Sequence, residues 1–223
     1  MLRIILTLLL ITLCAPATAQ DISRELQQLS AVNRINPLQN PEFSRSEDIF
    51  DRRVLDRKSK VVGEVKDILV HKNGSLESMA VDFDRLRLGA TVFLNFRQTS
   101  IRPLDDAYEL AMDANELREF YPSLLANMAT ASGTEDDVYS TKRLKGIDVR
   151  KASGRKIGEI EDILFSANGA RVSALFVEIT KGTQRGETIA IPFRSTEFKE
   201  QSGRLYAEVS DTLAEAVLTL ADD

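Results

Sequence analysis

The chain contains one pattern twice, and this duplication limits the folds that it can adopt. Residues 49–74 and 144–169 align without a gap at a spacing of 95, and eight of the aligned pairs are identical. A period of this length is too long for a solenoid repeat, and it has the size of a small domain. The sequence therefore predicts two tandem domains, one at residues 49–121 and one at residues 139–221.

Most of the identical residues are types that turns and strand irregularities require. Glycine accepts backbone conformations that other residues avoid, and Asn and Asp bind nearby main-chain groups. We take them as the structural signature of the repeat. The signature comprises Gly63, Asp67, Asn73 and Gly74 in the first copy, and Gly158, Asp162, Asn168 and Gly169 in the second.

Each copy has the pattern of short β-strands. Residues 61–70 and 156–165 are rich in β-branched residues, and each run leads into an Asn-Gly pair that predicts a type I′ hairpin turn with positive φ at both residues. Helical spacing after Asp113 and Ser210 predicts a short helix at the end of each copy. We therefore expect a mainly β fold: two tandem small antiparallel β-barrels, each followed by a short C-terminal helix, since closure removes exposed strand edges.

The composition favours two small hydrophobic cores over one large core. Aromatic residues make up 6% of the chain, and Trp is absent. Aromatic side chains supply much of the buried area of large cores. We expect each domain to bury its own apolar side chains.

The first 19 residues have the features of a cleaved secretory signal peptide. Arg3 precedes an apolar run at residues 4–13, and Ala17 and Ala19 match an A-x-A cleavage site with the cut after Ala19. Ten residues rise only about 15 Å as a helix, which is half the hydrocarbon core of a bilayer, so a stable transmembrane anchor is not expected. A lipoprotein signal ending at Cys14 is a lesser alternative, because Leu13 stands where a small residue is usual. The predicted location is the periplasm, or the medium after secretion.

Two further segments are predicted to be linkers, one before the first domain and one between the domains. Residues 20–48 contain apolar residues at helical spacing and then two Asn-Pro pairs, which predict an N-terminal linker with one short helix. Residues 122–138 begin with Pro122 and contain the acidic run 135–137, which predicts an interdomain linker. The first linker could dock on the protein itself or on a partner.

Several functional classes are disfavoured. The formal net charge of −5 argues against nonspecific nucleic-acid binding, which needs clustered Lys and Arg. The one Cys lies in the predicted signal, so the mature chain has no thiolate for a zinc site or a nucleophile. His71 is the one histidine, and no nucleophile elbow, Walker motif or dinucleotide motif occurs. We expect a chain that is not an enzyme, with no cofactor, no metal and no catalytic residue.

Asp67 and Asp162 allow two interpretations. Both fall in phase with apolar residues of their strands, where an unpaired carboxylate would be costly. The functional interpretation is a ligand or metal contact repeated in each barrel, and the structural one is an Asp that accepts main-chain N–H bonds at a bulge or turn. The other acidic clusters lack the spacing of a calcium loop, and we interpret them as solvated charge: Asp82 with Asp84, Asp105 with Asp106, and residues 135–137.

The second copy resembles a known family. The residues that carry the resemblance lie at 144–149, at 154–164, at Asn168-Gly169 and at 191–193. They are similar to the PRC-barrel domain, which occurs in the H subunit of photosynthetic reaction centres and in a ribosome-maturation factor. The resemblance covers residues 140–200 well. It implies a small barrel used as an adaptor module and carries over no catalytic residue.

The first copy resembles the family more weakly, over residues 47–104. It departs where Asp51, Ser59 and Asn95 replace Gly146, Gly154 and Pro192 of the second copy. The resemblance therefore supports the fold of this copy more than its turn geometry.

The expected function is an exported, non-enzymatic binding or scaffold protein of the bacterial cell envelope, with a protein partner of unknown identity. A first alternative is a small-ligand or metal-binding protein, or an enzyme, that uses the cleft between the two barrels. A second is an accessory factor of a membrane redox or photosynthetic complex, which rests on fold analogy alone.

Overall fold

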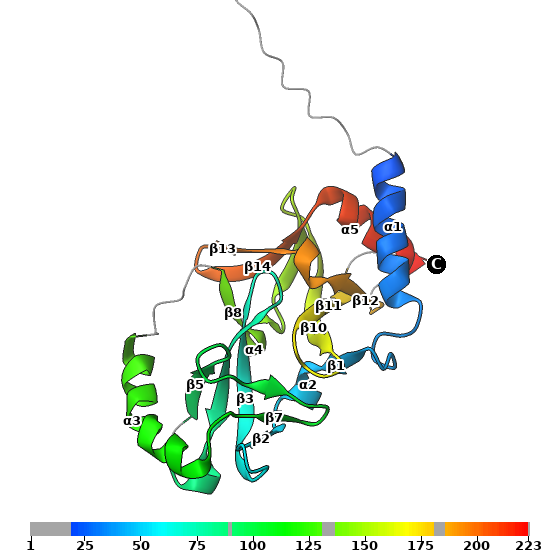
Figure 1. Cartoon of the computed structure of the whole chain (residues 1–223). Coiled ribbons are helices and arrows are strands. Elements are labelled where there is room, and N and C mark those ends of the chain that lie inside the picture. The colour runs from blue at the N-terminus through cyan, green and yellow to red at the C-terminus, as the bar shows by residue number, and fades with distance from the viewer. Residues whose placement is uncertain (1–18, 89–90, 131–136, 181–185, 223) are drawn as a thin grey trace, which may run out of the picture.

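The computed structural model of the chain describes residues 19–88, 91–130, 137–180 and 186–222 (Figure 1). The predicted signal peptide lies outside these ranges, with Cys14 and Ala17, except for Ala19 at the start of the first helix. Within the described ranges, no helix is both long enough and apolar enough to cross a membrane.

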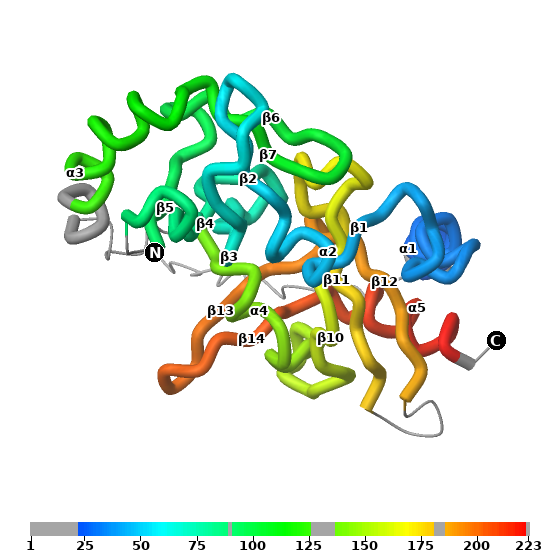
Figure 2. The backbone as a smooth tube through the Cα atoms, turned by 90° about the horizontal axis from the view of Figure 1, so that it is seen from below, coloured from blue at the N-terminus to red at the C-terminus, as the bar shows by residue number. Residues whose placement is uncertain are grey.

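The two repeats form two modules with matching elements. Module 1 consists of β2 (Arg53–Leu55), β3 (Val61–His71), β4 (Leu76–Asp82), η1 (Asp84–Leu86), β5 (Thr91–Asn95), β6 (Arg102–Pro103), β7 (Ala107–Glu109) and α3 (Ala114–Thr130). Module 2 consists of β9 (Asp148–Lys151), β10 (Lys156–Ser166), β11 (Val172–Ile179), β12 (Thr188–Pro192), η3 (Phe193–Ser195), β13 (Glu197–Gln201), β14 (Arg204–Val209) and α5 (Asp211–Asp222). A further helix, α1 (Ala19–Asn33), lies beside α5 at the end of the molecule opposite α3 (Figures 1 and 2).

The mainly β fold is confirmed, but closed antiparallel barrels are not. The described strands form two seven-stranded sheets whose main paths are identical, β5-β4-β3-β2-β7-β6 and β12-β11-β10-β9-β14-β13. In each module, the first strand in chain order pairs in parallel with the last, β2 with β7 and β9 with β14. The path of hydrogen bonds stays open between its end strands. Even so, four residues link β12 to β13 at the opposite end of the path, and such a link spans at most about 17 Å, so the sheet must curl strongly.

The Asn-Gly hairpins form at the predicted positions with a different turn. Positive φ occurs at Gly74 (82°) and Gly169 (71°), but not at Asn73 or Asn168. The N–H of Gly74 donates to the carbonyl of His71 at 2.7 Å, and the N–H of Gly169 makes the matching bond to Ser166. This is a type I turn followed by a left-handed glycine, so the predicted type I′ geometry is wrong. The extra residue of the longer loop removes the need for positive φ at the asparagine.

Two short segments leave their own module and fold on the other. The first leading segment, residues 43–49, contains β1 (Phe43–Arg45) and α2 (Ser46–Ile49); the second, residues 138–144, contains β8 (Val138–Ser140) and α4 (Thr141–Leu144). β1 pairs with β10 of module 2, and β8 pairs with β3 of module 1 (Figure 1). The two segments are 95 residues apart, so the repeat extends further toward the N-terminus than sequence identity shows. Each precedes one module and completes the sheet of the other.

The segments predicted as linkers are therefore partly regular structure. Most of the first leading segment lies in the predicted linker 20–48, and α3 runs through Pro122 into the predicted linker 122–138. The helix continues past Pro122 because Leu117, Tyr121 and Leu124 are buried on one face at helical spacing. That burial outweighs the loss of one main-chain hydrogen bond.

The expectation of two separate cores is wrong. One cluster of buried apolar side chains includes Val54 and Phe83 of module 1 together with Phe165 and Val217 of module 2. Ile49 and Leu144, the last residues of the two leading segments, are both fully buried in it. Because each leading segment carries apolar side chains into the other module, the two interiors merge.

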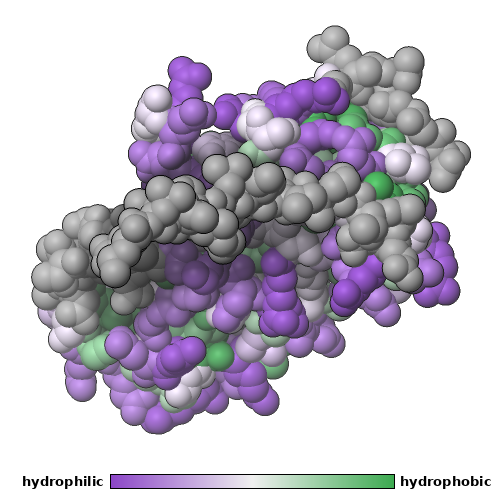
Figure 3. Space-filling model, turned by 90° about the horizontal axis from the view of Figure 1, so that it is seen from above, coloured by the Kyte–Doolittle hydropathy of each residue, from purple (hydrophilic) through white to green (hydrophobic). Residues whose placement is uncertain are grey.

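The surface is mostly polar. On the face shown in Figure 3, hydrophilic residues prevail and hydrophobic ones appear in small areas between them. Among the described residues, the large apolar side chains that stay exposed are Ile35, Leu38, Phe93, Phe120 and Leu125.

Candidate functional site

Asp162 fixes the first leading segment to module 2. Its side chain is fully buried and accepts hydrogen bonds from Arg45 Nε at 2.8 Å and from the hydroxyl of Ser46. The main-chain N–H of Ile163 donates to the same carboxylate at 2.8 Å, and Lys145 Nζ lies 3.4 Å from it. A buried carboxylate with this many donors is compensated for the loss of water.

Asp67 fixes the second leading segment to module 1 in the same way. The hydroxyls of Ser140 and Thr141 donate to its carboxylate at 2.6 and 3.1 Å. The main-chain N–H groups of Lys142 and Ile68 donate at 3.2 and 2.8 Å. Four hydrogen-bond donors thus bind this carboxylate, and all four are uncharged groups.

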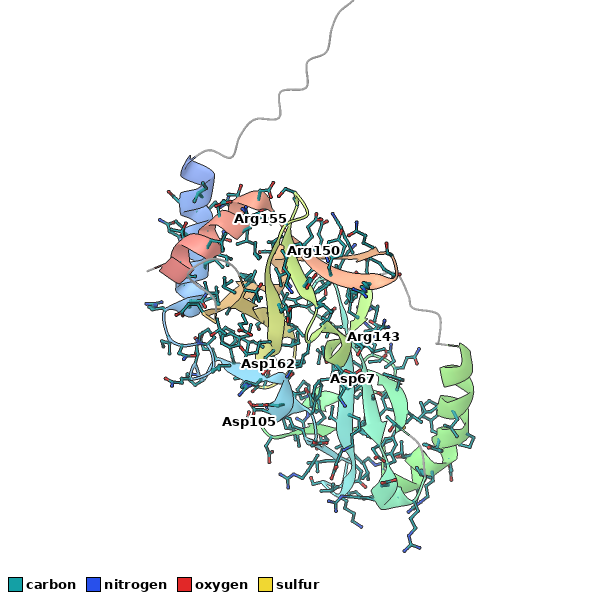
Figure 4. The ribbon with its side chains drawn as sticks, turned by 180° about the vertical axis from the view of Figure 1, so that it is seen from behind. Asp67, Asp105, Arg143, Arg150, Arg155 and Asp162 are labelled. Carbon is teal, nitrogen blue, oxygen red and sulfur yellow. The ribbon has the colours of Figure 1, made fainter. Side chains whose placement is uncertain are left out.

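The two carboxylates occupy equivalent places close to the junction of the modules (Figure 4). Each follows a register shift in its strand, after Val65 in β3 and after Ile160 in β10. A β-bulge leaves one residue out of the ladder and turns its side chain aside. The bulge allows each Asp to cap the neighbouring N–H and to reach the leading segment.

The electrostatics of Asp162 reflect competing effects. Burial alone would raise the pKa of its carboxyl group. The hydrogen bonds from Ser46, Arg45 and the N–H of Ile163, together with the charge of Lys145, lower this pKa by more than burial raises it. The pKa of Asp162 therefore lies below its usual value. The same hydrogen bond raises the pKa of Arg45, so both groups are charged near neutral pH.

The two Asn-Gly turns form a second pair of contacts between the modules. The buried hydroxyl of Tyr108 in module 1 donates to the carbonyl of Gly169 at 2.9 Å, and burial raises the pKa of this phenol. In the other direction, the N–H of Val172 in module 2 donates to the carbonyl of Gly74 at 2.9 Å. A side chain at Gly169 would collide with the Tyr108 hydroxyl, and one at Gly74 would collide with the carbonyl of Val172. These glycines allow one module to approach the other closely.

Gly63 and Gly158 allow close approach within each sheet. A Cβ at Gly63 would lie 2.5 Å from the carbonyl of Asp82 on the neighbouring strand. A Cβ at Gly158 would meet the carbonyl of Glu178 in the same way. The recurring signature thus serves the bulges, the turns and the close contacts of the fold.

The structure favours the structural interpretation of the two aspartates over a ligand site. Their oxygens are bonded to the leading segments, and no three His, Cys, Asp or Glu side chains of the described residues gather closely enough to hold a metal. Two shallow hollows lie elsewhere. One, of about 350 Å³, is lined by Glu64, Asp82, Asp84 and neighbours in module 1, and one of about 510 Å³ lies between the end of α1, β12 and α5.

The remaining candidates are dispersed. His71 ends β3, and its Nδ1 is buried without a hydrogen-bond partner among the described residues. Asp106 forms an ion pair with Arg53, and Asp137 pairs with Lys72 at 2.6 Å. Residues 135 and 136 lie outside the described ranges. The structure brings none of these groups to Asp67 or Asp162.

The residues that bind the two aspartates are not among those predicted from the sequence. Ser46 and Thr141 are both hydroxyl residues, and they stand at the repeat spacing of 95. Extending the alignment by three residues toward the N-terminus would have paired them. Arg45 and Ser140 also occupy equivalent positions but differ in chemistry, so no identity marks them.

The second copy of the repeat matches a known protein family. Residues 136–213 match the PRC-barrel domain family. The match covers about a third of the chain, and it begins just before β8 and ends within α5. It confirms the resemblance of the second copy. No curated protein matches the chain.

The residues at which the PRC-barrel match begins are relevant to the exchange of leading segments between the modules. The matched residues include the second leading segment, whose strand β8 pairs with β3 of module 1. The family pattern therefore extends over a strand that, in this chain, is part of the other module's sheet. A cut at residue 136 would remove the first leading segment from module 2.

Proposed function

We propose that this chain is an exported, non-enzymatic binding or scaffold protein of the bacterial cell envelope, and that its partner is a protein. The observation that carries the proposal is the use of the recurring polar groups. Asp67, Asp162 and the Asn-Gly turns all bind other parts of the same chain. Because those groups are occupied internally, the exterior of the paired modules is left to make contacts with other molecules.

We also propose that residues 49–121 are a diverged second PRC-barrel module. Support comes from the identical strand order of the two sheets and from the spacing of 95 between their equivalent residues. Two fused modules present a larger rigid surface than one, which suits a scaffold.

Export is proposed on sequence grounds. The apolar run at residues 4–13 and the alanines at 17 and 19 support cleavage after Ala19. Intact mass spectrometry of the native protein tests this, and we expect a chain that begins at Gln20. A cytosolic protein that retains Met1 would contradict it.

The binding role is tested by capture from envelope extract. The purified chain, immobilised through its C-terminus, should reproducibly enrich one or a few proteins over a bead control. The same enrichment should appear after crosslinking in intact cells. Absence of any enriched protein in both experiments would contradict the proposal.

A thermal-shift screen tests the non-enzymatic part of the proposal. Metals and small metabolites are expected to leave the melting temperature unchanged. A rise that grows with ligand concentration would indicate a small-ligand site and would contradict a purely protein-binding role.

A further inference from the structure

The free edge of β12 in module 2 is covered by helix α1. The side-chain amide of Asn33 donates to the carbonyl of Ala190 at 2.9 Å and accepts from the N–H of Ala190 at 2.8 Å. Leu29 of α1 is fully buried in the main core, and Val32 packs against a separate small cluster that includes Phe176 and Ala190. The helix thus satisfies an edge strand with one amide side chain and covers both faces beside it.

Among the described residues, no helix covers the equivalent edge of module 1, that of β5, as α1 covers β12, although α3 contacts β5. Phe93 pairs with Ala80 as Ala190 pairs with Phe176, so Phe93 stands where Ala190 stands. The N–H of Phe96 donates to the carbonyl of Glu77 in β4, and inward bonding alternates along an antiparallel strand. The main-chain N–H and C=O of Phe93 therefore face away from β4, and no described residue bonds them on that side. The side chain of Phe93 is 36% exposed.

Helix α3 occupies the place of α5 and not that of α1. Both helices follow the last strand of their module, and their N-terminal caps, Asp113 and Ser210, stand at equivalent positions. Counting from the caps, Phe120 of α3 corresponds to Val217 of α5. Val217 is fully buried in module 2, where α1 packs on α5, whereas Phe120 is 37% exposed. One exposed aromatic residue thus lies on β5, and another lies on α3, which contacts β5.

We propose that the edge of β5, with Phe93 on the strand and Phe120 on the contacting helix α3, binds an amphipathic helix of a partner protein with the chemistry of α1. Such a helix presents apolar side chains at the spacing of Leu26, Leu29 and Val32, followed by an amide side chain in the place of Asn33. The amide would pair with the main chain of Phe93, and the apolar side chains would cover the two phenylalanines. This surface deepens the proposed binding role and rests on it.

The internal duplication identifies the type of occupant. Module 2 shows that a helix such as α1 satisfies this edge. The edge pair has one alanine and one phenylalanine in each module, Ala80 with Phe93 and Phe176 with Ala190, so the volume of the paired side chains is similar. A second copy of this chain is a poorer occupant, because its α1 already covers its own β12. A helix from another protein would cover the β5 edge of module 1 while α1 stays on the β12 edge of module 2.

The probe for this surface is a fluorescent peptide of residues 20–36, titrated into the full chain and followed by anisotropy. We expect saturable one-to-one binding with a Kd on the order of 10–100 μM, because a free helix of this length is marginal in water.

The double variant Phe93→Glu with Phe120→Glu should weaken binding at least about tenfold. The control, Ile35→Glu with Leu38→Glu, changes two exposed apolar residues that follow α1, 52% and 38% exposed, and should leave Kd unchanged. A peptide with Asn33→Ala should bind about tenfold more weakly, since it loses two hydrogen bonds.

Three results would overturn the assignment. The first is no saturable binding up to about 1 mM, and the second is binding that the Phe93/Phe120 variant leaves unchanged. The third is concentration-dependent self-association of the full chain that this variant abolishes, which would assign the surface to a second copy. Circular dichroism of each variant verifies that it is folded, and exchange protection of the Phe93 amide by the peptide gives an independent readout.

The proposed function is tested separately with the same variant. If capture from envelope extract enriches the same protein with the native chain and with the Phe93/Phe120 variant, the binding role stands and the surface is wrong. If neither enriches any protein, the binding role itself is contradicted.

Discussion

At the scale of single residues, Asp67 and Asp162 perform the same task with different partners. Asp162 is fully buried and faces two cations, Arg45 and Lys145, whereas Asp67 is bound by hydroxyls and main-chain N–H groups. The penalty for removing one partner of a buried ion pair is larger than that for removing a neutral hydrogen bond. The two positions therefore form a matched pair for mutation.

We expect Asp162→Ala to lower the free energy of unfolding by about 3 kcal/mol, because it leaves Arg45 and Ser46 with unpaired groups next to the core. Asp67→Ala should cost less, about 1–2 kcal/mol, since it removes neutral hydrogen bonds. Urea unfolding measures both. An equal or larger loss for Asp67→Ala would contradict the electrostatic account.

The depressed pKa of Asp162 also predicts a pH dependence. Its folded-state pKa lies below the unfolded value, so its contribution to stability is complete above the unfolded pKa of about 3.9 and is lost as the pH falls further toward the folded pKa. Stability of the native chain should therefore fall more steeply below about pH 4 than that of Asp162→Asn. Urea midpoints measured between pH 5 and pH 2 test this, and parallel curves for the two proteins would contradict it.

At the scale of elements, the strands and hairpin positions could be predicted and the exchange could not. The long strands β3 and β10 have β-branched residues and end at Asn-Gly, which are local signals. The predicted type I′ turn is wrong because the length of the loop, and not the Asn-Gly pair alone, sets the turn conformation. The leading strands β1 and β8 have three residues each, too few for a periodic pattern, and their pairing across modules has no local signal. The paired aspartates were found, but the groups that bind them were not.

The turn contact predicts a difference between two glycines. Gly169 and Gly154 both have positive φ, 71° and 87°, but a Cβ meets Tyr108 at Gly169 and nothing within 4 Å at Gly154. Gly154→Ala should cost about 1 kcal/mol for the backbone alone. Gly169→Ala should cost about 2 kcal/mol more, because the two modules must separate. Thermal unfolding of both variants measures this, and equal losses would show that the close approach is unimportant.

At the scale of the whole molecule, two repeats that look like separate domains form one interlocked unit. Each leading segment completes the other module, the Asn-Gly turns bind across the junction, and one apolar core joins them. Sequence periodicity revealed the duplication but favoured independent units, because nothing in a local pattern says which copy a segment pairs with. An interlocked pair whose β5 edge is left uncovered by the described residues suits the binding role proposed above.

Cooperative unfolding tests the interlocked arrangement most directly. Urea unfolding followed by NMR gives separate curves for amide signals of β4 in module 1 and β11 in module 2 at equilibrium. A shared core and exchanged segments predict one midpoint and one slope for both sets of signals. Two transitions with separate midpoints, one for each module, would contradict the account.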